Sequence, residues 1–308
     1  MRERLEGMMQ RTISRRINLQ GIGLHTGERV EVSFSPASPN TGIVLKRVDL
    51  EGKEPIRVSL RECKADAMRG SILVRDGTKI FTVEHLLSAI KGLGIDNILV
   101  EIKGSEVPAL DGSALPFAEK LLEAGIVEQD VPRRRITLSS PIWVNGGDSF
   151  IAAFPYPTFK VSYTIAYDHP FLSSQFLSYE LSPDTFLREI APARTYAFKH
   201  EVDLIFKSGL GKGGSLENTV IVDENGVLNP EGLRFQDEFV RHKILDLIGD
   251  MALLDGWLSA HVVAIKAGHA LHLKLASKIL EEVESKGDAQ NRYHYEGSAS
   301  SLSLSAGG

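Results

Sequence analysis

A histidine and two carboxylates recur at helical spacing in the segment 239–250. His242 and Asp246 are four residues apart and Asp250 follows one turn later, so the three side chains project from one side of a predicted helix. Neutral imidazole and carboxylate both bind zinc, which makes His242 and Asp246 candidate ligands of one divalent metal ion. The alternative is an exposed His–Asp pair on a solvated helix face. The metal interpretation therefore needs a third ligand, a base and a pocket from elsewhere in the chain.

A second candidate pair, Glu84 and His85, lies far earlier in the sequence. The pattern predicts a helix over 82–92 that directly follows a strand, with Thr82 as its N-cap. Both side chains then lie in the first helical turn, on a rigid part of the chain. A catalytic zinc usually has three protein ligands and one open position, which His85 would complete. Glu84 would supply a proton acceptor beside that ligand.

Two further residues could serve the same chemistry. His269 follows a glycine at a strand-to-helix turn, from which it can reach a pocket and donate a proton to a leaving amine. Thr195 could stabilise an oxyanion through its hydroxyl group. A lone histidine is more often a hydrogen-bonded core residue, and His272, three positions after His269, could form a different metal motif with it. No serine-hydrolase or Walker motif is present, so serine hydrolysis and phosphoryl transfer have no support.

Composition narrows the class of protein. The chain has 308 residues and a net charge of -5, which argues against nucleic acid as its main partner. The single Cys63 excludes an internal disulfide and fits a reducing compartment. The first residues have no signal-peptide pattern, and no apolar run reaches the roughly 20 residues of a membrane helix. We expect a cytoplasmic protein without a transmembrane segment, and a transient contact with the inner-membrane surface stays open.

Apolar periodicity predicts an α+β fold of two parts. A polar, charged segment at 128–135 is the predicted link between domains 1–130 and 131–284, and the polar, Ser-rich segment 285–308 is predicted to be disordered after a helix that ends near residue 283. The element order helix, strand, loop, helix occurs once around His85 and again around His242. If the two parts pack with their polar helix faces together, Glu84 and His85 meet His242 and Asp246. The predicted strands are 30–34, 43–45, 70–74, 79–81, 97–102, 136–138, 142–144, 150–154, 160–166, 219–222 and 260–265.

Several longer motifs lie in order along most of the chain. They are Thr-Val-Glu-His-Leu-Leu-Ser-Ala at 82–89, Gly-Leu-Gly-Ile-Asp-Asn at 92–97, Asp-Gly-Ser-Ala-Leu-Pro-Phe at 111–117, Ala-Arg-Thr-Tyr-Ala-Phe at 193–198, the whole of 233–250, and Lys-Ala-Gly-His-Ala at 266–270. Together they resemble the UDP-3-O-acyl-N-acetylglucosamine deacetylases (LpxC) of lipid A synthesis. The resemblance implies two similar α+β domains, each a layered sheet-and-helix sandwich, with the active site between them. It also implies a zinc-dependent amidase that releases acetate from an acylated UDP-sugar.

The resemblance assigns roles to individual residues. The residues that match the zinc ligands are His85, His242 and Asp246, although Fe²⁺ stays open as the metal. Those that match the catalytic groups are Glu84 as general base, His269 as the proton donor or charge stabiliser, and Thr195 as the oxyanion contact, with Asp250 as the partner of His269. The matches to substrate-binding positions are Lys243 for a phosphate and Tyr196, which stands where Phe is common. The insert at 196–222, with Val202, Leu204, Ile205 and Phe206, matches a passage for the acyl chain.

Two alternatives remain beside the zinc deacetylase. A non-catalytic protein with the same fold could bind a nucleotide sugar in the cleft, but a pure binding role needs no base beside a metal ligand. A zinc deacetylase that acts on another N-acyl sugar would differ only in its substrate. A monomer is the expected state.

Overall fold

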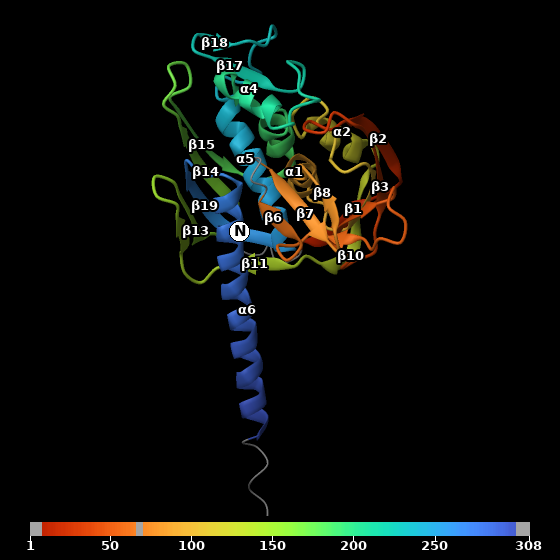
Figure 1. The fold of residues 1–308 in the computed structure, drawn as a ribbon. Coiled ribbons are helices and arrows are strands. Elements are labelled where there is room, and N and C mark those ends of the chain that lie inside the picture. Colours follow the sequence, from red (N-terminus) through yellow and green to blue (C-terminus); the bar gives the residue numbers. More distant parts are fainter. Residues whose placement is uncertain (1–7, 66–69, 300–308) are drawn as a thin grey trace, which may run out of the picture.

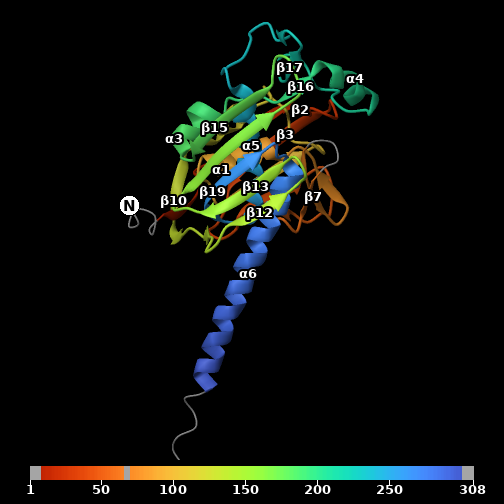
Figure 2. The same cartoon turned by 90° about the vertical axis from the view of Figure 1, so that its left-hand side faces the viewer.

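The computed structural model describes residues 8–65 and 70–299, and it has an α+β fold built on two five-stranded arrangements. In Figure 1 the helices α1 and α5 lie between these two sheets. Figure 2 looks onto the second sheet, with α5 and α1 behind it. The α+β class expected from the sequence is therefore confirmed.

The first sheet is made from the N-terminal part of the chain. Its residues alternate between buried and exposed along β3, where Val30, Val32 and Phe34 face the core, as a strand with one covered face requires. Its strands, in order across the sheet, are β2 (Ile17–Ile22), β3 (Arg29–Pro36), β9 (Ile98–Lys103), β4 (Ile43–Arg47) and β5 (Ile56–Arg57).

The second sheet repeats this arrangement with strands from the C-terminal part. In each sheet the central strand, β9 or β19, is antiparallel to one neighbour and parallel to the other, and the outer pairs are antiparallel. Its order is β12 (Ile142–Asn145), β13 (Phe150–Pro155), β19 (Trp257–Ile265), β14 (Phe159–Ala166) and β15 (Ser174–Glu180), with β11 (Arg135–Thr137) pairing parallel to β19. The internal repeat predicted from element order is thus confirmed by strand topology.

The helices complete the repeat, because α1 and α2 flank β9 in the chain as α5 and α6 flank β19. In both views α6 extends away from the body of the molecule (Figures 1 and 2). Within the described residues, no helix is long and apolar enough to cross a membrane. The helices are α1 (Glu84–Gly92), α2 (Leu115–Glu123), α3 (Pro183–Thr185), α4 (Lys199–Lys207), α5 (Glu238–Met251) and α6 (His269–Ala299), with a π-helical turn at Phe186–Ile190 and a 3-10 turn at Ala252–Leu254.

Three small sheets are added to the two large ones. One of them joins the two ends of the first part, and the other two are insertions, one in each part. They are β1 (Met9–Ile13) with β10 (Ile126–Pro132); β6 (Cys63–Ala65) with β7 (Ser71–Arg75) and β8 (Thr78–Ile80); and β16 (Tyr196–Phe198) with β17 (Val220–Asp223) and β18 (Gly226–Val227).

Three expectations are corrected. The segment predicted as a polar link is largely the strand β10, because its backbone pairs antiparallel with that of β1 although many of its side chains are polar. Thr82 is not the N-cap of α1: its backbone φ is +56° and its hydroxyl donates to Glu106, so Val83 takes the cap position. α6 extends to Ala299 rather than ending near residue 283. Of the predicted disordered tail, residues 300–308 lie outside the described part.

Candidate active site

Helix α5 is buried on almost every side, which excludes the exposed His–Asp pair as an interpretation. The exposed fractions of His242, Asp246 and Asp250 are 3%, 3% and 1%. α5 packs against α1 so closely that a Cβ added to Gly249 would lie 2.2 Å from the backbone oxygen of Glu84. This glycine therefore allows the helix that carries His242 to approach the helix that carries Glu84.

The three predicted metal ligands meet at this contact. The carboxylate oxygen Oδ1 of Asp246 lies 3.4 Å from Nε2 of His242 and 3.8 Å from Nε2 of His85. Tetrahedral ligands with bonds of about 2.05 Å to zinc are about 3.4 Å apart, so the spacing suits such an ion. His242 directs Nδ1 at the carbonyl oxygen of Ala193 at 3.1 Å, which leaves Nε2 for a metal. The donor set therefore fits a divalent metal ion.

The electrostatics of the three residues agree with this interpretation. Burial and the neighbouring His242 lower the pKa of His85 to about 3, and burial also lowers the pKa of His242. Burial opposes ionisation of Asp246, but Lys243 and the imidazoles around it hold its pKa well below the usual value. Two neutral imidazoles and one carboxylate are the protonation states that a metal requires of its ligands.

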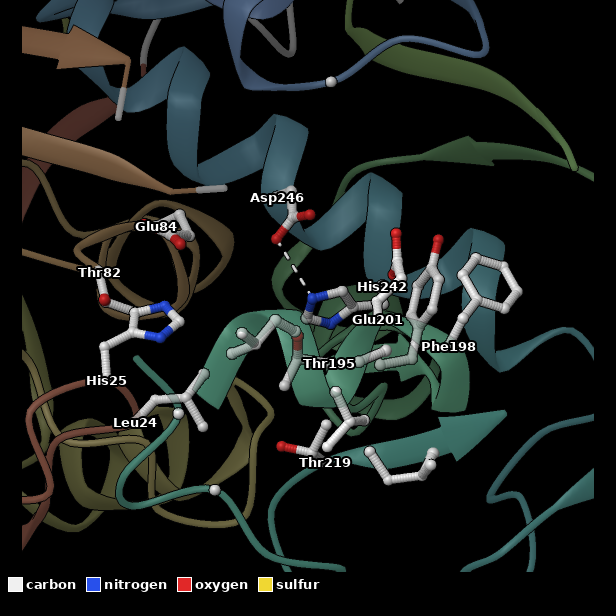
Figure 3. Close-up of a pocket in the computed structure, with 18 of the residues that line it drawn as sticks. Leu24, His25, Thr82, Glu84, Thr195, Phe198, Glu201, Thr219, His242 and Asp246 are labelled. Atoms are coloured by element: carbon white, nitrogen blue, oxygen red, sulfur yellow. Dashed lines mark ion pairs between the residues drawn. The ribbon is translucent and has the colours of Figure 1, made fainter. Parts of the chain in front are cut away.

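Glu84 lies in the first turn of α1, next to His85 and 4% exposed. Burial raises the pKa of Glu84 to about 7, although His269 acts in the opposite direction. A carboxylate with a pKa near neutrality is suited to accept and return a proton in that pH range. In Figure 3, Glu84 and Thr82 lie on one side of the cavity, and His242 and Asp246 lie on the other.

His269 is the first residue of α6 and belongs to a buried hydrogen-bonded chain. Its Nδ1 lies 2.7 Å from Oδ2 of Asp250, and Nδ1 of His272 lies 2.7 Å from the same oxygen. Nε2 of His272 is in turn 3.0 Å from the hydroxyl of Tyr163. Because these contacts already use one oxygen for both imidazoles, the geometry favours a hydrogen-bonded network over a second metal site. Burial lowers the pKa of His269, but the Asp250 carboxylate outweighs it and raises the pKa to about 9.

The three candidate metal ligands line a cavity of about 680 Å³. The apolar side chains of Val202, Ile205 and Phe206 from α4 belong to the same lining, and the part of the cavity that they border is the apolar arm. Leu204, which we expected beside them, is 66% exposed and does not line the cavity. The four expected residues all lie within the segment 202–206 of one helix, so their side chains project in different directions. Only the structure shows which of them face the cavity.

The remaining predicted residues also reach this cavity. Thr195 and Lys243 line it, and the Lys243 ammonium lies 2.7 Å from Oδ2 of Asp246. Tyr196 lines it too, with its hydroxyl 2.7 Å from that of Tyr167 and its ring centroid 6.1 Å from that of His242. Apart from Leu204, the site residues predicted from the sequence therefore line this cavity or, like Asp250, contact a residue that lines it, and His25 lines it as well.

The structure adds a residue that sequence reasoning missed. Glu106 is fully buried, and its carboxylate accepts hydrogen bonds from the backbone N–H groups of His25 and Thr26 at 2.9 Å. It also accepts one from the hydroxyl of Thr82 at 3.0 Å. It thus holds together the loop that carries His25 and the turn that precedes Glu84. The only available signal was a charged residue in a short loop, which is far too common to be informative.

Comparison with known proteins assigns the chain to a family. The family model described as LpxC: UDP-3-O-acyl N-acetylglycosamine deacetylase matches residues 10–281. A UDP-3-O-acyl-N-acetylglucosamine deacetylase of Myxococcus xanthus is 44% identical over 89% of this chain and 87% of its own length. Those of Saccharophagus degradans and Chromobacterium violaceum are each 42% identical, over 89% and 90% of this chain and 90% and 92% of their own lengths. The chain therefore belongs to the LpxC family of UDP-3-O-acyl-N-acetylglucosamine deacetylases.

Proposed function

We propose that this protein removes the acetyl group of a UDP-3-O-acyl-N-acetylglucosamine at the inner end of its cavity, with zinc held by His85, His242 and Asp246. The family is one of deacetylases, hydrolases that act on an amide bond in lipid A biosynthesis. The observation that carries the assignment to this site is that Glu84 and His269 flank the three candidate ligands in one cavity. The Nε2 atom of His269 lies 3.8 Å from Oδ2 of Asp246.

The chemistry follows from the positions of the side chains. Zinc at these ligands would lower the pKa of water and polarise the amide carbonyl. Glu84 takes a proton from the water that attacks the carbonyl carbon, and Thr195 donates a hydrogen bond to the oxygen that becomes negatively charged. His269, held protonated by Asp250, donates its proton to the nitrogen as the C–N bond breaks. The products are acetate and the free amine.

The rest of the cavity suits the rest of the substrate. The apolar arm beside α4 accepts the acyl chain, with Val202, Ile205 and Phe206 as its walls. Lys243 provides the cation for a substrate phosphate, and the ring of Tyr196 borders the sugar. The proposal keeps a transient contact with the inner-membrane surface, supported by the exposed side chain of Leu204 on α4.

We assign residues 1–130 and 131–284 to two similar domains, each a layered sheet-and-helix sandwich, with the site between them. The support is the repeated strand order and the contact of α1 with α5 at the metal ligands. A cytoplasmic monomer with zinc as its metal, and Fe²⁺ as the alternative, completes the proposal.

The decisive experiment measures acetate release from the acylated UDP-sugar by the wild type and by Glu84→Gln. The variant keeps the shape of the side chain but cannot accept a proton, so kcat should fall by about 10²- to 10⁴-fold. Glu123→Gln, at an exposed glutamate of α2, is the control and should leave kcat unchanged. Metal content is measured for each protein, and activity after chelation is tested with added Zn²⁺ or Fe²⁺.

Each alternative has its own outcome in this assay. Full activity of Glu84→Gln, or a wild type that no metal reactivates, contradicts the mechanism. Tight binding of the UDP-sugar without acetate release would indicate a nucleotide-sugar-binding protein. Equal kcat/KM for an unacylated UDP-sugar would indicate a deacetylase of another N-acyl sugar.

A further inference from the structure

Ser71, the first residue of β7, contacts the proposed general base Glu84 and also Asp250, the proposed partner of His269. We propose that it is a positioning residue that sets the orientation of Glu84 and, through Asp250, of His269; this inference rests on the proposed function. Its backbone N–H donates to Oε2 of Glu84 at 3.1 Å, and its hydroxyl donates to Oδ1 of Asp250 at 2.7 Å. Ser71 is itself only 1% exposed.

The hydroxyl contact determines how the Asp250 carboxylate is rotated. Oδ2 of that carboxylate is used by His269 and His272, as described above. Within the described residues, the Ser71 hydroxyl is the hydrogen-bond donor that reaches Oδ1. A carboxylate held at both oxygens has one orientation, and that orientation directs the imidazole of His269 towards the substrate.

The backbone of Ser71 is placed firmly enough for this role. Ser71 pairs with Ala65 across the hairpin of β6 and β7, and its carbonyl oxygen accepts from the N–H of Val83 at 3.5 Å. A Cβ at the preceding residue, Gly70, would lie 2.9 Å from Oε1 of Glu84, so the strand runs directly against that carboxylate. Ser71 therefore joins the start of α1 to α5, which belong to different parts of the chain.

The test separates the hydroxyl from the backbone contact. Ser71→Ala keeps the N–H that holds Glu84 but leaves Oδ1 of Asp250 without its donor. We expect kcat to fall by about 10- to 100-fold, the usual effect of losing such an outer contact. The KM and the bound metal should stay at wild-type values, whereas the thermal unfolding midpoint should fall by a few degrees because a buried carboxylate oxygen loses its donor. Ser71→Thr retains the hydroxyl and should restore kcat to within about threefold of wild type.

A matched control is available in α1. Ser88 is also fully buried, but among the described residues its hydroxyl has no hydrogen-bond partner, so Ser88→Ala should leave kcat unchanged. If Ser71→Ala yields no folded protein, Ser71→Cys keeps a similar volume with only a weak donor and should show the same loss of kcat. Wild-type kcat in Ser71→Ala, or equal impairment of the alanine and threonine variants, overturns the inference.

Failure of this inference can be told apart from failure of the proposed function. If Glu84→Gln is inactive while Ser71→Ala has wild-type kcat, only the role of Ser71 is wrong. If Glu84→Gln keeps its activity, the proposed function itself is wrong.

Discussion

The two large sheets have the same strand order, but the helices beside them carry different chemistry. In the first part, α1 places Glu84 and His85 in its first turn, at one end of the helix. In the second part, α5 places His242, Asp246 and Asp250 along its length. Neither helix holds a complete set of metal ligands, so the candidate site exists only where the two meet.

The insertions differ as much as the helices do. The first part adds the hairpin of β7 and β8, which brings Ser71 to the site, and the second adds α4 with its neighbouring strands, which forms the apolar arm. A repeated framework thus positions the two helices, while the unrepeated segments supply the proposed positioning residue Ser71 on one side and part of the cavity wall on the other. The candidate reaction centre and the proposed acyl passage therefore have separate structural origins.

The largest effect is expected when a candidate metal ligand is removed, and such substitutions test whether both parts of the chain are needed for metal binding. His85→Ala removes the ligand from α1, and His242→Ala removes one from α5. Each should lose bound zinc and reduce kcat/KM by more than the roughly 10- to 100-fold that outer contacts contribute. Metal analysis and acetate release are the measurements. A His85→Ala protein with full metal content would mean that the second part binds the ion alone.

Lys91, a buried lysine in the last turn of α1, predicts that the free energy of unfolding depends on pH. Lys91 of α1 lies over the ring of Trp257, 4.1 Å from its centroid, and donates to the carbonyl oxygen of Gly256 at 2.5 Å. Burial lowers the pKa of Lys91 to about 8, from 10.5 in the unfolded chain. Below pH 8 the folded protein bears the full free-energy cost of burying the charged ammonium. Between pH 8 and pH 10.5 the buried amine is neutral while the unfolded chain stays protonated, so this cost falls and the free energy of unfolding rises with pH.

Lys91→Met should therefore be compared with the wild type by chemical denaturation from pH 7 to pH 10.5. The wild type should gain about 3 kcal/mol of unfolding free energy relative to the variant over this range. A difference that does not change with pH would show that the ammonium of Lys91 is as well accommodated in the folded protein as in water.

Gly249→Ala tests the closeness of α1 and α5 directly. The added Cβ meets backbone atoms of Glu84, which cannot rotate away, so the helices must separate. We expect a loss of about 1–3 kcal/mol in the free energy of unfolding and a lower metal affinity. Gly268→Ala is the control, because a Cβ there meets nothing within 4 Å. Equal stability of the two variants would contradict the tight contact.

The smallest expected effect concerns the insert that only the second part has. Ile205 lines the cavity, whereas Leu204 beside it is exposed. Ile205→Ala should lower kcat/KM for a long-chain acyl substrate about fivefold, through lost apolar contact. Leu204→Ala should stay within about twofold. A comparison of long- and short-chain substrates checks that the effect grows with chain length.

The sequence by itself indicated the family and a candidate site. The spacing of His242 and Asp246 and the adjacent Glu84 and His85 singled out candidate ligands and a candidate base, and the order of several motifs gave the resemblance to the family that the comparisons confirm. It also indicated the repeat, because hydrophobic periodicity records which segments are helices and strands. These features depend on residue type and local spacing, which are visible along the chain.

Only the tertiary structure decided how these residues meet. The strand β10 was mistaken for a link because pairing with β1 depends on a partner more than a hundred residues away in sequence. The contacts of Ser71 with Glu84 and Asp250, and of Glu106 with the loop at His25, join segments that no local pattern connects. Side-chain hydrogen bonds between distant segments depend on packing geometry, so a single sequence carries no periodic signal for them.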